Sequence, residues 1–506
     1  MSRKRIAAFG FLYDIGGTAI LQFVTFVVTP LYLTLSGSEQ YGYWLTIGSI
    51  LNWLYLSDFG ISLAILRSAV AAIESKDASV LNSLIRTGFI LFWIAAIVFF
   101  IVGISLSGVL INWFDVPDQH RDLFLTTYFL TVVTGGLTFP FSVFGAVVQA
   151  YQKIAYHRIV TSATTLLGIG VTVALLLTGQ GLVSFSLGML ATVVSAGLLN
   201  YLYFRKLVPG FRFFPIRIDR YVSRKLIRFG GYFQIGQLAN IVALNTDNII
   251  IASLLTASVV STYALTSKLA VLFSVTLISK IPSALFPGIS QMVEQRNTEG
   301  LQRTFLSLFR ITLRLGITGA LFVFVVNKTF VDNWVGPESY GGDPLNLVWV
   351  YIILVDSVIR GISIFVFSFG DLKGWAMASL AETVLNIGLS LILINYYGIV
   401  GVAVATAIAR SVTVGLYTPT MLSKRLELPF TRVFGNILDV VVRSLPSLAT
   451  ALIFVFIRID LNPWVWMAFV GSSLVFANFL CFELPYLLQS DHRSLKERIL
   501  SLKSYY

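Results

Sequence analysis

Long apolar stretches separated by short polar segments dominate the chain. Each apolar stretch approaches or exceeds the roughly 20 residues that an α-helix needs to cross about 30 Å of hydrocarbon. This pattern predicts about fourteen membrane-spanning helices, grouped as six, six and two. The predicted spans are 12–35, 41–66, 84–110, 122–150, 157–178, 182–204, 229–255, 259–290, 308–330, 345–369, 375–396, 398–422, 433–457 and 464–488.

Composition agrees with this pattern. The 506 residues are 56% hydrophobic and only 12% charged, and their mean hydropathy is +0.83. Such a chain is too apolar for a soluble protein, so we predict an all-α polytopic membrane protein. The single cysteine, Cys481, excludes a disulfide within the chain, and the three histidines are scattered, so we expect no metal site.

The net charge of +12 reports topology rather than a nucleic-acid partner. If the N-terminus is cytoplasmic, most Lys and Arg residues fall on the cytoplasmic side, as membrane proteins generally arrange them. Only Arg121, Lys328 and Arg458 then lie outside. An even number of spans places the C-terminus in the cytoplasm as well.

The segment 229–268 repeats the beginning of the chain. Tyr43 matches Tyr263 at an offset of 220 (263 − 43), and Leu45-Thr46 matches Leu265-Thr266 at the same offset. Repeated lobes around a midplane site are typical of transporters. We therefore predict a first lobe at 1–206, a basic linker and second lobe at 207–424, and two further helices with a basic tail at 425–506.

Two basic segments suggest contact with lipid headgroups. The linker 205–228 interleaves Lys and Arg with aromatic residues such as Phe211 and Tyr221, and the tail 490–506 is also basic. Both are either ordinary surface segments or amphipathic strips on anionic membrane lipids.

Polar residues within predicted spans are the main candidates for a functional site. Asn245-Thr246-Asp247-Asn248 interrupts one span, and Lys268 lies in the next at a similar depth. Such groups are costly in lipid, so they normally face a bundle interior or a watery cavity. Asp247 and Lys268 either form an ion pair or face one cavity together.

Lys280 lies on the same predicted helix as Lys268, together with Pro282 and Pro287. Proline removes a backbone hydrogen bond, so we expect the prolines to kink this helix. Two amines on a bendable helix suit a phosphate-bearing ligand. Alternatively, Lys280 extends to the cytoplasmic surface.

The remaining charges suggest pairs. Asp356 and Arg360 are four residues apart on one helix, where side chains meet. Arg410 lies in an alanine-rich segment suited to close helix packing, and it has either Glu382 or a ligand as its partner. Asp58 and Arg67 are expected to fix the inner end of the second helix.

Several motifs resemble those of bacterial polysaccharide transporters. They are Glu39-Gln40-Tyr41-Gly42, Leu56-Ser57-Asp58-Phe59-Gly60-Ile61 with Arg67, Thr246-Asp247-Asn248-Ile249-Ile250-Ile251-Ala252, and Tyr263-Ala264-Leu265-Thr266-Ser267-Lys268-Leu269. These transporters are O-antigen (Wzx-type) flippases of lipid-linked oligosaccharides. Their superfamily, the multidrug/oligosaccharidyl-lipid/polysaccharide (MOP) flippases, also contains lipid II flippases and multidrug and toxin extrusion (MATE) antiporters.

The resemblance implies a V-shaped pair of lobes that passes an undecaprenyl-diphosphate-linked repeat to the external leaflet of the bacterial inner membrane by alternating access. It implies no enzyme activity or cofactor, H⁺ or Na⁺ as candidate coupling ions, and glycan polymerase or chain-length machinery as candidate partners. Unlike lipid II flippases, this chain has no base within its first span. The polar and charged residues in or near the predicted spans supply the candidates: Lys268, Lys280, Arg360, Asn245 and Asn248 for substrate binding, and Asp247, Asp58, Arg67, Asp356, Glu382 and Arg410 for coupling or gating.

Three other functions remain as alternatives. An ion-coupled multidrug antiporter would use Asp247 and Glu382, but buried lysines would repel a cationic substrate. A membrane enzyme would need an exposed site, and the predicted external loops are short, the longest being 331–344. A structural scaffold has little reason to carry this many intramembrane charges.

Overall fold

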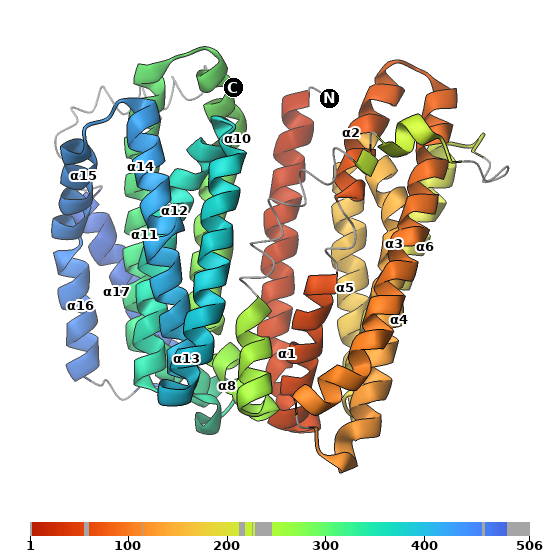
Figure 1. The fold of residues 1–506 in the computed structure, drawn as a ribbon. Coiled ribbons are helices and arrows are strands. Elements are labelled where there is room, and N and C mark those ends of the chain that lie inside the picture. Colours follow the sequence, from red (N-terminus) through yellow and green to blue (C-terminus); the bar gives the residue numbers. More distant parts are fainter. Residues whose placement is uncertain are drawn as a thin grey trace. The chain divides into compact units, whose positions relative to one another are not determined.

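The computed structural model describes residues 3–54, 60–114, 116–211, 218–224, 226–227, 245–457 and 461–482. All regular elements in these ranges are helices (Figure 1), which confirms the predicted all-α class. The helices are α1 (Arg3–Leu54), α2 (Ile61–Glu74), α3 (Ala78–Trp113), α4 (Asp118–Ala150), α5 (Ile154–Leu177), α6 (Val183–Leu207), an unlabelled helix at 245–254, α8 (Ala257–Thr266), α9 (Lys268–Val271), η2 (Leu272–Leu277), α10 (Ile278–Glu294), α11 (Thr298–Trp334), η3 (Pro337–Ser339), α12 (Asp343–Ser368), α13 (Leu372–Val412), α14 (Val414–Leu426), α15 (Phe430–Arg443), α16 (Leu445–Phe456) and α17 (Pro463–Phe482).

The described helices also bear out the multi-pass character. Nine of them are long and apolar enough to cross a membrane, or up to eleven if each of two bent pairs counts as one span. α1 and α13 each contain a break at a glycine, Gly37 (φ 78°) and Gly398 (φ 55°), where a residue with a Cβ is disfavoured. Both breaks fall where the hydrophobic pattern separates two spans. The span 229–255 is described only from residue 245, so the full number of spans stays a prediction.

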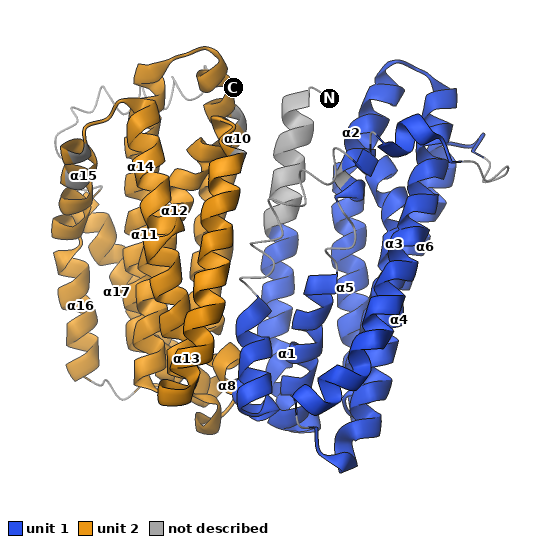
Figure 2. Cartoon of the chain, in the orientation of Figure 1, with its two compact units in different colours: residues 1–261 blue, residues 262–506 orange. Residues whose placement is uncertain are grey.

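Contacts divide the chain into two compact units, residues 1–261 and 262–506 (Figure 2). Unit 1 contains α1 to α6, the helix 245–254 and the start of α8. Unit 2 contains the rest of α8 and everything after it. The predicted boundary at 206/207 came from the sequence repeat, whereas the units follow spatial contacts, which group 245–261 with the first lobe. The three predicted domains and the repeat therefore stay predictions.

The interior of unit 1 is held by aromatic packing and neutral hydrogen bonds. Phe92 of α3 and Phe124 and Tyr128 of α4 are fully buried. Thr131 of α4 and Ser186 of α6 lie 2.6 Å apart between their hydroxyl oxygens, and this contact ties the two helices together.

The linker between the predicted lobes is anchored to unit 1 at two points. Phe211 is 1% exposed and its ring packs edge-on against that of Phe204, with 5.3 Å between centroids. Asp219 accepts a hydrogen bond from the Ser83 hydroxyl at 3.1 Å. Contact of this linker with lipid headgroups stays a prediction, and the tail 490–506 lies outside the described residues.

Unit 2 has a phenylalanine core to which the last helices are attached. Phe305 of α11 packs edge-on against Phe365 of α12, with 5.5 Å between ring centroids. Arg314 of α11 reaches α17, where its Nε donates to Asn478 Oδ1 at 2.6 Å and its guanidinium lies 4.3 Å from the Phe482 ring centroid. A polar contact thus joins α17 to the body of the unit.

Candidate functional site

Four ionisable side chains meet inside unit 2. Arg410 Nε donates to Glu382 Oε1 at 2.9 Å, and Arg410 Nη1 donates to Asp356 Oδ1 at 2.8 Å. Arg360 Nη2 lies 3.8 Å from Asp356 Oδ2. The predicted contacts of Asp356 with Arg360 and of Glu382 with Arg410 are both confirmed. The sequence did not reveal that Arg410 joins them into one cluster, which we call the charge cluster.

The break in α13 creates this arrangement. Because the chain turns at Gly398, the two halves of α13 bring Glu382 and Arg410 together across 28 positions. The contact continues away from the charges, where Asn386 donates to Thr406 at 3.2 Å and Ser390 donates to Asn386 at 2.8 Å. Glu382, Asn386 and Ser390 are spaced four apart, so they share one helix face.

The two carboxylates of the charge cluster are buried, so they need Arg410 as a partner that offsets the loss of water. Asp356 is 3% exposed and Glu382 is 8% exposed. Removing a carboxylate from water costs several kcal/mol unless a partner and hydrogen bonds offset it. Arg410 supplies both, and its side chain is only 14% exposed. We therefore interpret Arg410 as the structural centre of the charge cluster.

Arg360 is held more loosely. Its side chain is 26% exposed, and its ion pair with Asp356 has the longest distance in the cluster. Within the described residues, Arg360 Nε and Asp356 Oδ2 are buried and have no hydrogen bond. Arg360 and Asp356 thus both have hydrogen-bonding capacity left, and of the two Arg360 carries the positive charge that suits an anionic ligand.

A second feature of unit 2 is a sharp bend just before Lys268. The segments Ala257–Thr266 and Lys268–Ser283 meet at 51°. Asn327 of α11, which is fully buried, donates to the carbonyl oxygen of Thr266 at 2.9 Å. The Gly341 N–H donates to the Thr266 hydroxyl at 2.8 Å. A side chain that engages a helix carbonyl is one of the known causes of a kink.

The 51° bend does not coincide with Pro282 or Pro287, and kinks at these prolines stay a prediction. The 51° bend precedes Pro282, which lies within the continuous helix α10 (Ile278–Glu294). A π-helix at Leu272–Leu277 separates the bend from α10, and such segments often occur at functional sites. The sequence signal that could have indicated the bend is Asn327, an amide within an otherwise apolar run.

Lys268 is the first residue after the bend. It lies 11 positions (268 − 257) beyond the start of α8, or about 16 Å along a helix, which is about half the thickness of a bilayer core. The side chain is partly buried. No hydrogen bond or ion pair of its ammonium is found among the residues that the structure describes. Lys280 is also partly buried, further along in α10.

The amides predicted to bind substrate are engaged with α1 inside unit 1. Asn52 donates to Asn245 Oδ1 at 3.0 Å, and Asn248 donates to the Ser49 hydroxyl at 3.0 Å. Asp247 is 9% exposed on the same helix. Asp247 belongs to unit 1 and Lys268 to unit 2, so their pairing stays a prediction.

Three motif positions near the start of the chain, Gly42, Asp58 and Arg67, have different outcomes. A Cβ at Gly42 would overlap the carbonyl group of Ala257, so glycine permits a close approach of α1 to the start of α8. Asp58 lies outside the described residues, and Arg67 is exposed on α2. The predicted pairing of Asp58 with Arg67 therefore stays a prediction.

Sequence comparison places these features in a family. The family described as "Polysaccharide biosynthesis protein" matches residues 12–293, which is more than half of the chain. The chain belongs to this family. The resemblance inferred from the motifs is thereby confirmed.

Two relatives cover most of the chain. "Uncharacterized membrane protein EpsK" of Bacillus subtilis (strain 168) is 22% identical over 413 residues, covering 79% of this chain and 80% of that protein. "Putative O-antigen export protein" of Yersinia pseudotuberculosis is 21% identical over 421 residues, covering 80% of this chain and 93% of that protein.

Solved structures share the fold. Lipid II flippase MurJ in an inward closed conformation matches with a TM-score of 0.69 and 16% identity, covering 94% of this chain and 99% of that one. An inward-facing multidrug resistance MATE family transporter of the MOP superfamily matches with a TM-score of 0.68 and 14% identity, covering 80% and 95%. This family member therefore has the MOP superfamily fold.

Proposed function

We propose that the protein is a flippase that moves an undecaprenyl-diphosphate-linked oligosaccharide from the cytoplasmic to the external leaflet of the bacterial inner membrane. It does so by alternating access, for the synthesis of O-antigen or another surface polysaccharide. Membership of the polysaccharide biosynthesis family and the fold shared with a lipid II flippase support this proposal. The distribution of basic residues supports cytoplasmic termini.

The proposal rests mainly on the partly buried ammonium group of Lys268. A partly buried ammonium near mid-membrane is costly without an anionic partner. No such partner is found for it among the described residues, and a diphosphate would supply one through charge-assisted hydrogen bonds. Arg360, with its partly exposed guanidinium, supports a second phosphate contact.

The charge cluster argues against the antiporter alternative. A carboxylate that exchanges cations must be free to bind them, whereas Asp356 and Glu382 both accept hydrogen bonds from Arg410. Their negative charge is already balanced by a cation of the chain itself. Coupling to H⁺ or Na⁺ remains part of the proposal.

The test is export of surface glycan in cells that lack the native transporter. Lys268→Ala is expected to reduce export by about tenfold or more, because it removes a charge-assisted contact. Lys268→Arg keeps the positive charge, so it should retain part of the export. Lys373→Ala is the matched control, because Lys373 is exposed near the start of α13. Cells with this variant should export surface glycan normally.

Membrane levels of each variant decide how the result is read. Normal export by Lys268→Ala at normal protein levels would show that Lys268 is not the phosphate contact. Degradation of that variant would instead assign Lys268 a structural role, and the phosphate contact would be sought at Arg360 or Lys280.

A further inference from the structure

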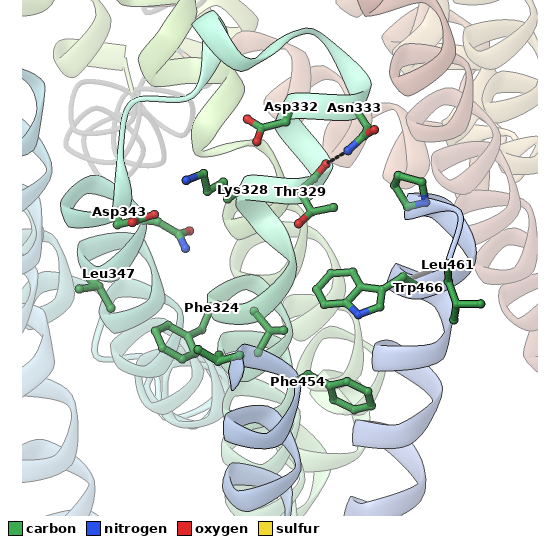
Figure 3. A pocket seen from close by; sticks show the side chains of 14 residues that line it. Phe324, Lys328, Thr329, Asp332, Asn333, Asp343, Leu347, Phe454, Leu461 and Trp466 are labelled. Carbon is green, nitrogen blue, oxygen red and sulfur yellow. Dashed lines mark hydrogen bonds between the residues drawn. The ribbon is translucent and has the colours of Figure 1, made fainter. Parts of the chain in front are cut away.

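A cavity of about 670 Å³ opens in unit 2 where α11 and α16 end and α12 and α17 begin (Figure 3). Its volume lies within the range of about 300–1,000 Å³ that is usual for small-molecule sites. The connection 335–342 joins two of these helix ends, and the proposed orientation places this connection outside. The cavity is separate from the charge cluster and from Lys268, and we call it the external cavity.

One wall of the external cavity carries charged groups. Figure 3 shows Lys328, Asp332 and Asp343 around its upper part. None of these three is ion-paired to another in the described part of the chain. Two carboxylates and one ammonium give this wall a net negative charge, which disfavours a phosphate. Their donors and acceptors remain available for hydroxyl groups.

The carboxylate of Asp343 is held in place. The Tyr340 hydroxyl donates to Asp343 Oδ1 at 2.8 Å. Burial, and then this hydrogen bond, raise the pKa of Tyr340 above its usual value, so the hydroxyl remains a donor at neutral pH. The second carboxylate oxygen of Asp343 has no hydrogen bond to a described residue, so it can accept one from a ligand.

Much of the remaining lining is aromatic. Trp466 of α17 is 9% exposed and Phe454 of α16 is 8% exposed, and Phe324 lies on α11 one turn from Lys328 (Figure 3). Aromatic faces bind apolar C–H surfaces, whereas carboxylates and amines bind hydroxyl groups. A sugar ring has both kinds of surface, because C–H groups cover its faces and hydroxyl groups surround its edge.

We propose that the external cavity binds the saccharide part of the substrate after it reaches the external side. This inference rests on the proposed function for the origin of the sugar. It assigns α16 and α17 a role in binding, because these helices supply Phe454 and Trp466. The bound sugar is neutral or carries an amine rather than a phosphate, since the charged wall is net negative.

A chain of hydrogen bonds connects the external cavity to the bend before Lys268. Asn346, which lines the cavity, accepts a hydrogen bond from Asn327 at 2.9 Å. Asn327 also donates to the carbonyl of Thr266, where the helix bends. A sugar in the external cavity would therefore contact a side chain two hydrogen bonds away from the bend.

Binding can be tested with the full-length protein in nanodiscs. The probe is the oligosaccharide released by mild acid from the lipid-linked pool of cells that depend on this protein, titrated calorimetrically. Asp332→Asn should weaken binding about tenfold, as expected when a hydrogen bond to a charged group is weakened. Trp466→Leu should weaken it as well, because the aromatic face is lost.

Two neighbouring residues provide matched controls. Trp464 lies two positions before Trp466 and is 50% exposed, but it faces a different, apolar groove. Glu338 is an exposed acid in the connection 335–342 and does not line the external cavity. Trp464→Leu and Glu338→Gln should bind the oligosaccharide like the wild type.

The outcomes separate this inference from the proposed function. If the wild type restores glycan export but does not bind the oligosaccharide, the external cavity is not a saccharide site and the flippase function stands. Equal weakening by test and control variants would also overturn the inference. Binding of glycerophosphoethanolamine without binding of the oligosaccharide would overturn it and assign the cavity to a lipid headgroup.

Discussion

In unit 1 several polar contacts between helices join neutral groups, such as Asn248 with Ser49 and Thr131 with Ser186. In unit 2 the corresponding contact joins full charges, with Arg410 between Asp356 and Glu382. A neutral hydrogen bond contributes a net of about 0.5–1.5 kcal/mol. Breaking a buried ion pair by removing one partner costs about 3–5 kcal/mol. The two units therefore respond very differently to the loss of one polar side chain.

The two kinds of contact respond differently when a charged ligand, an ion or a proton binds nearby. Neutral contacts in unit 1 hold helices together whatever the charge of the substrate. The charge cluster in unit 2 changes its energy whenever a proton, an ion or an anionic ligand approaches it. Unit 2 also contains Lys268 and its bend, so the charge-sensitive elements described here are concentrated in that unit.

The largest expected effect is that of Arg410→Met. It leaves Asp356 and Glu382 buried without their cation, so we expect a loss of about 3–5 kcal/mol in the free energy of unfolding. Chemical unfolding of the purified protein in mixed micelles measures this loss. Arg121→Met is the control, because Arg121 forms an exposed pair with Asp118 at 3.5 Å and should change stability by less than about 1 kcal/mol.

A double variant sharpens this prediction. Combining Arg410→Met with Glu382→Leu removes one cation and one anion and leaves Asp356 paired with Arg360, so it should regain most of the lost stability. If Arg410→Met alone is as stable as the control, the charge cluster does not hold unit 2 together and the contrast with unit 1 disappears.

Much of the fold could be predicted because lipid imposes strong rules on sequence. The breaks at Gly37 and Gly398 were visible as gaps between apolar runs. The contact of Asp356 with Arg360 was visible because both residues lie on one helix at a spacing of four. Local spacing along one helix was sufficient in these cases.

The missed features all depend on which helices are neighbours. Arg410 reaches Asp356 across 54 positions, and Asn327 reaches Thr266 across 61 positions. No spacing rule relates residues that far apart. Kinks were predicted only at Pro282 and Pro287, which are local signals, whereas the 51° bend lies where a side chain from another helix engages a carbonyl.

Asn327→Leu should have an effect between those of a lost charge in unit 2 and a lost neutral contact in unit 1. Asn327 belongs to unit 2 and is fully buried, but it is neutral. The substitution deprives the Thr266 carbonyl and Asn346 of their donor, and each unsatisfied group costs about 1–3 kcal/mol. Thermal unfolding in detergent should show the loss. Asn395→Leu is the matched control, since Asn395 is exposed on α13 of the same unit and donates to the carbonyl of Leu391 one turn away on its own helix.

Export of surface glycan is a second measurement for the Asn327→Leu variant. If the bend positions Lys268, Asn327→Leu should reduce export at normal membrane levels, whereas Asn395→Leu should not. Unchanged stability and export in Asn327→Leu would mean that the bend is maintained by other contacts, such as the one between Gly341 and Thr266.

The smallest expected effect is that of Ser49→Ala in unit 1. Asn248 loses its acceptor, but Ser49 is only one of several contacts between these helices, and the bond is neutral. A double-mutant cycle with Asn248→Leu isolates the pair, and we expect a coupling of about 0.5–1.5 kcal/mol.

Ser105→Ala is the control, because Ser105 is exposed and donates to a carbonyl of its own helix. A coupling as large as the cost of Arg410→Met would mean that the neutral contacts of unit 1 are as critical as the charges of unit 2. A coupling near zero would instead mean that Asn248 is available for the substrate, as the sequence motifs imply.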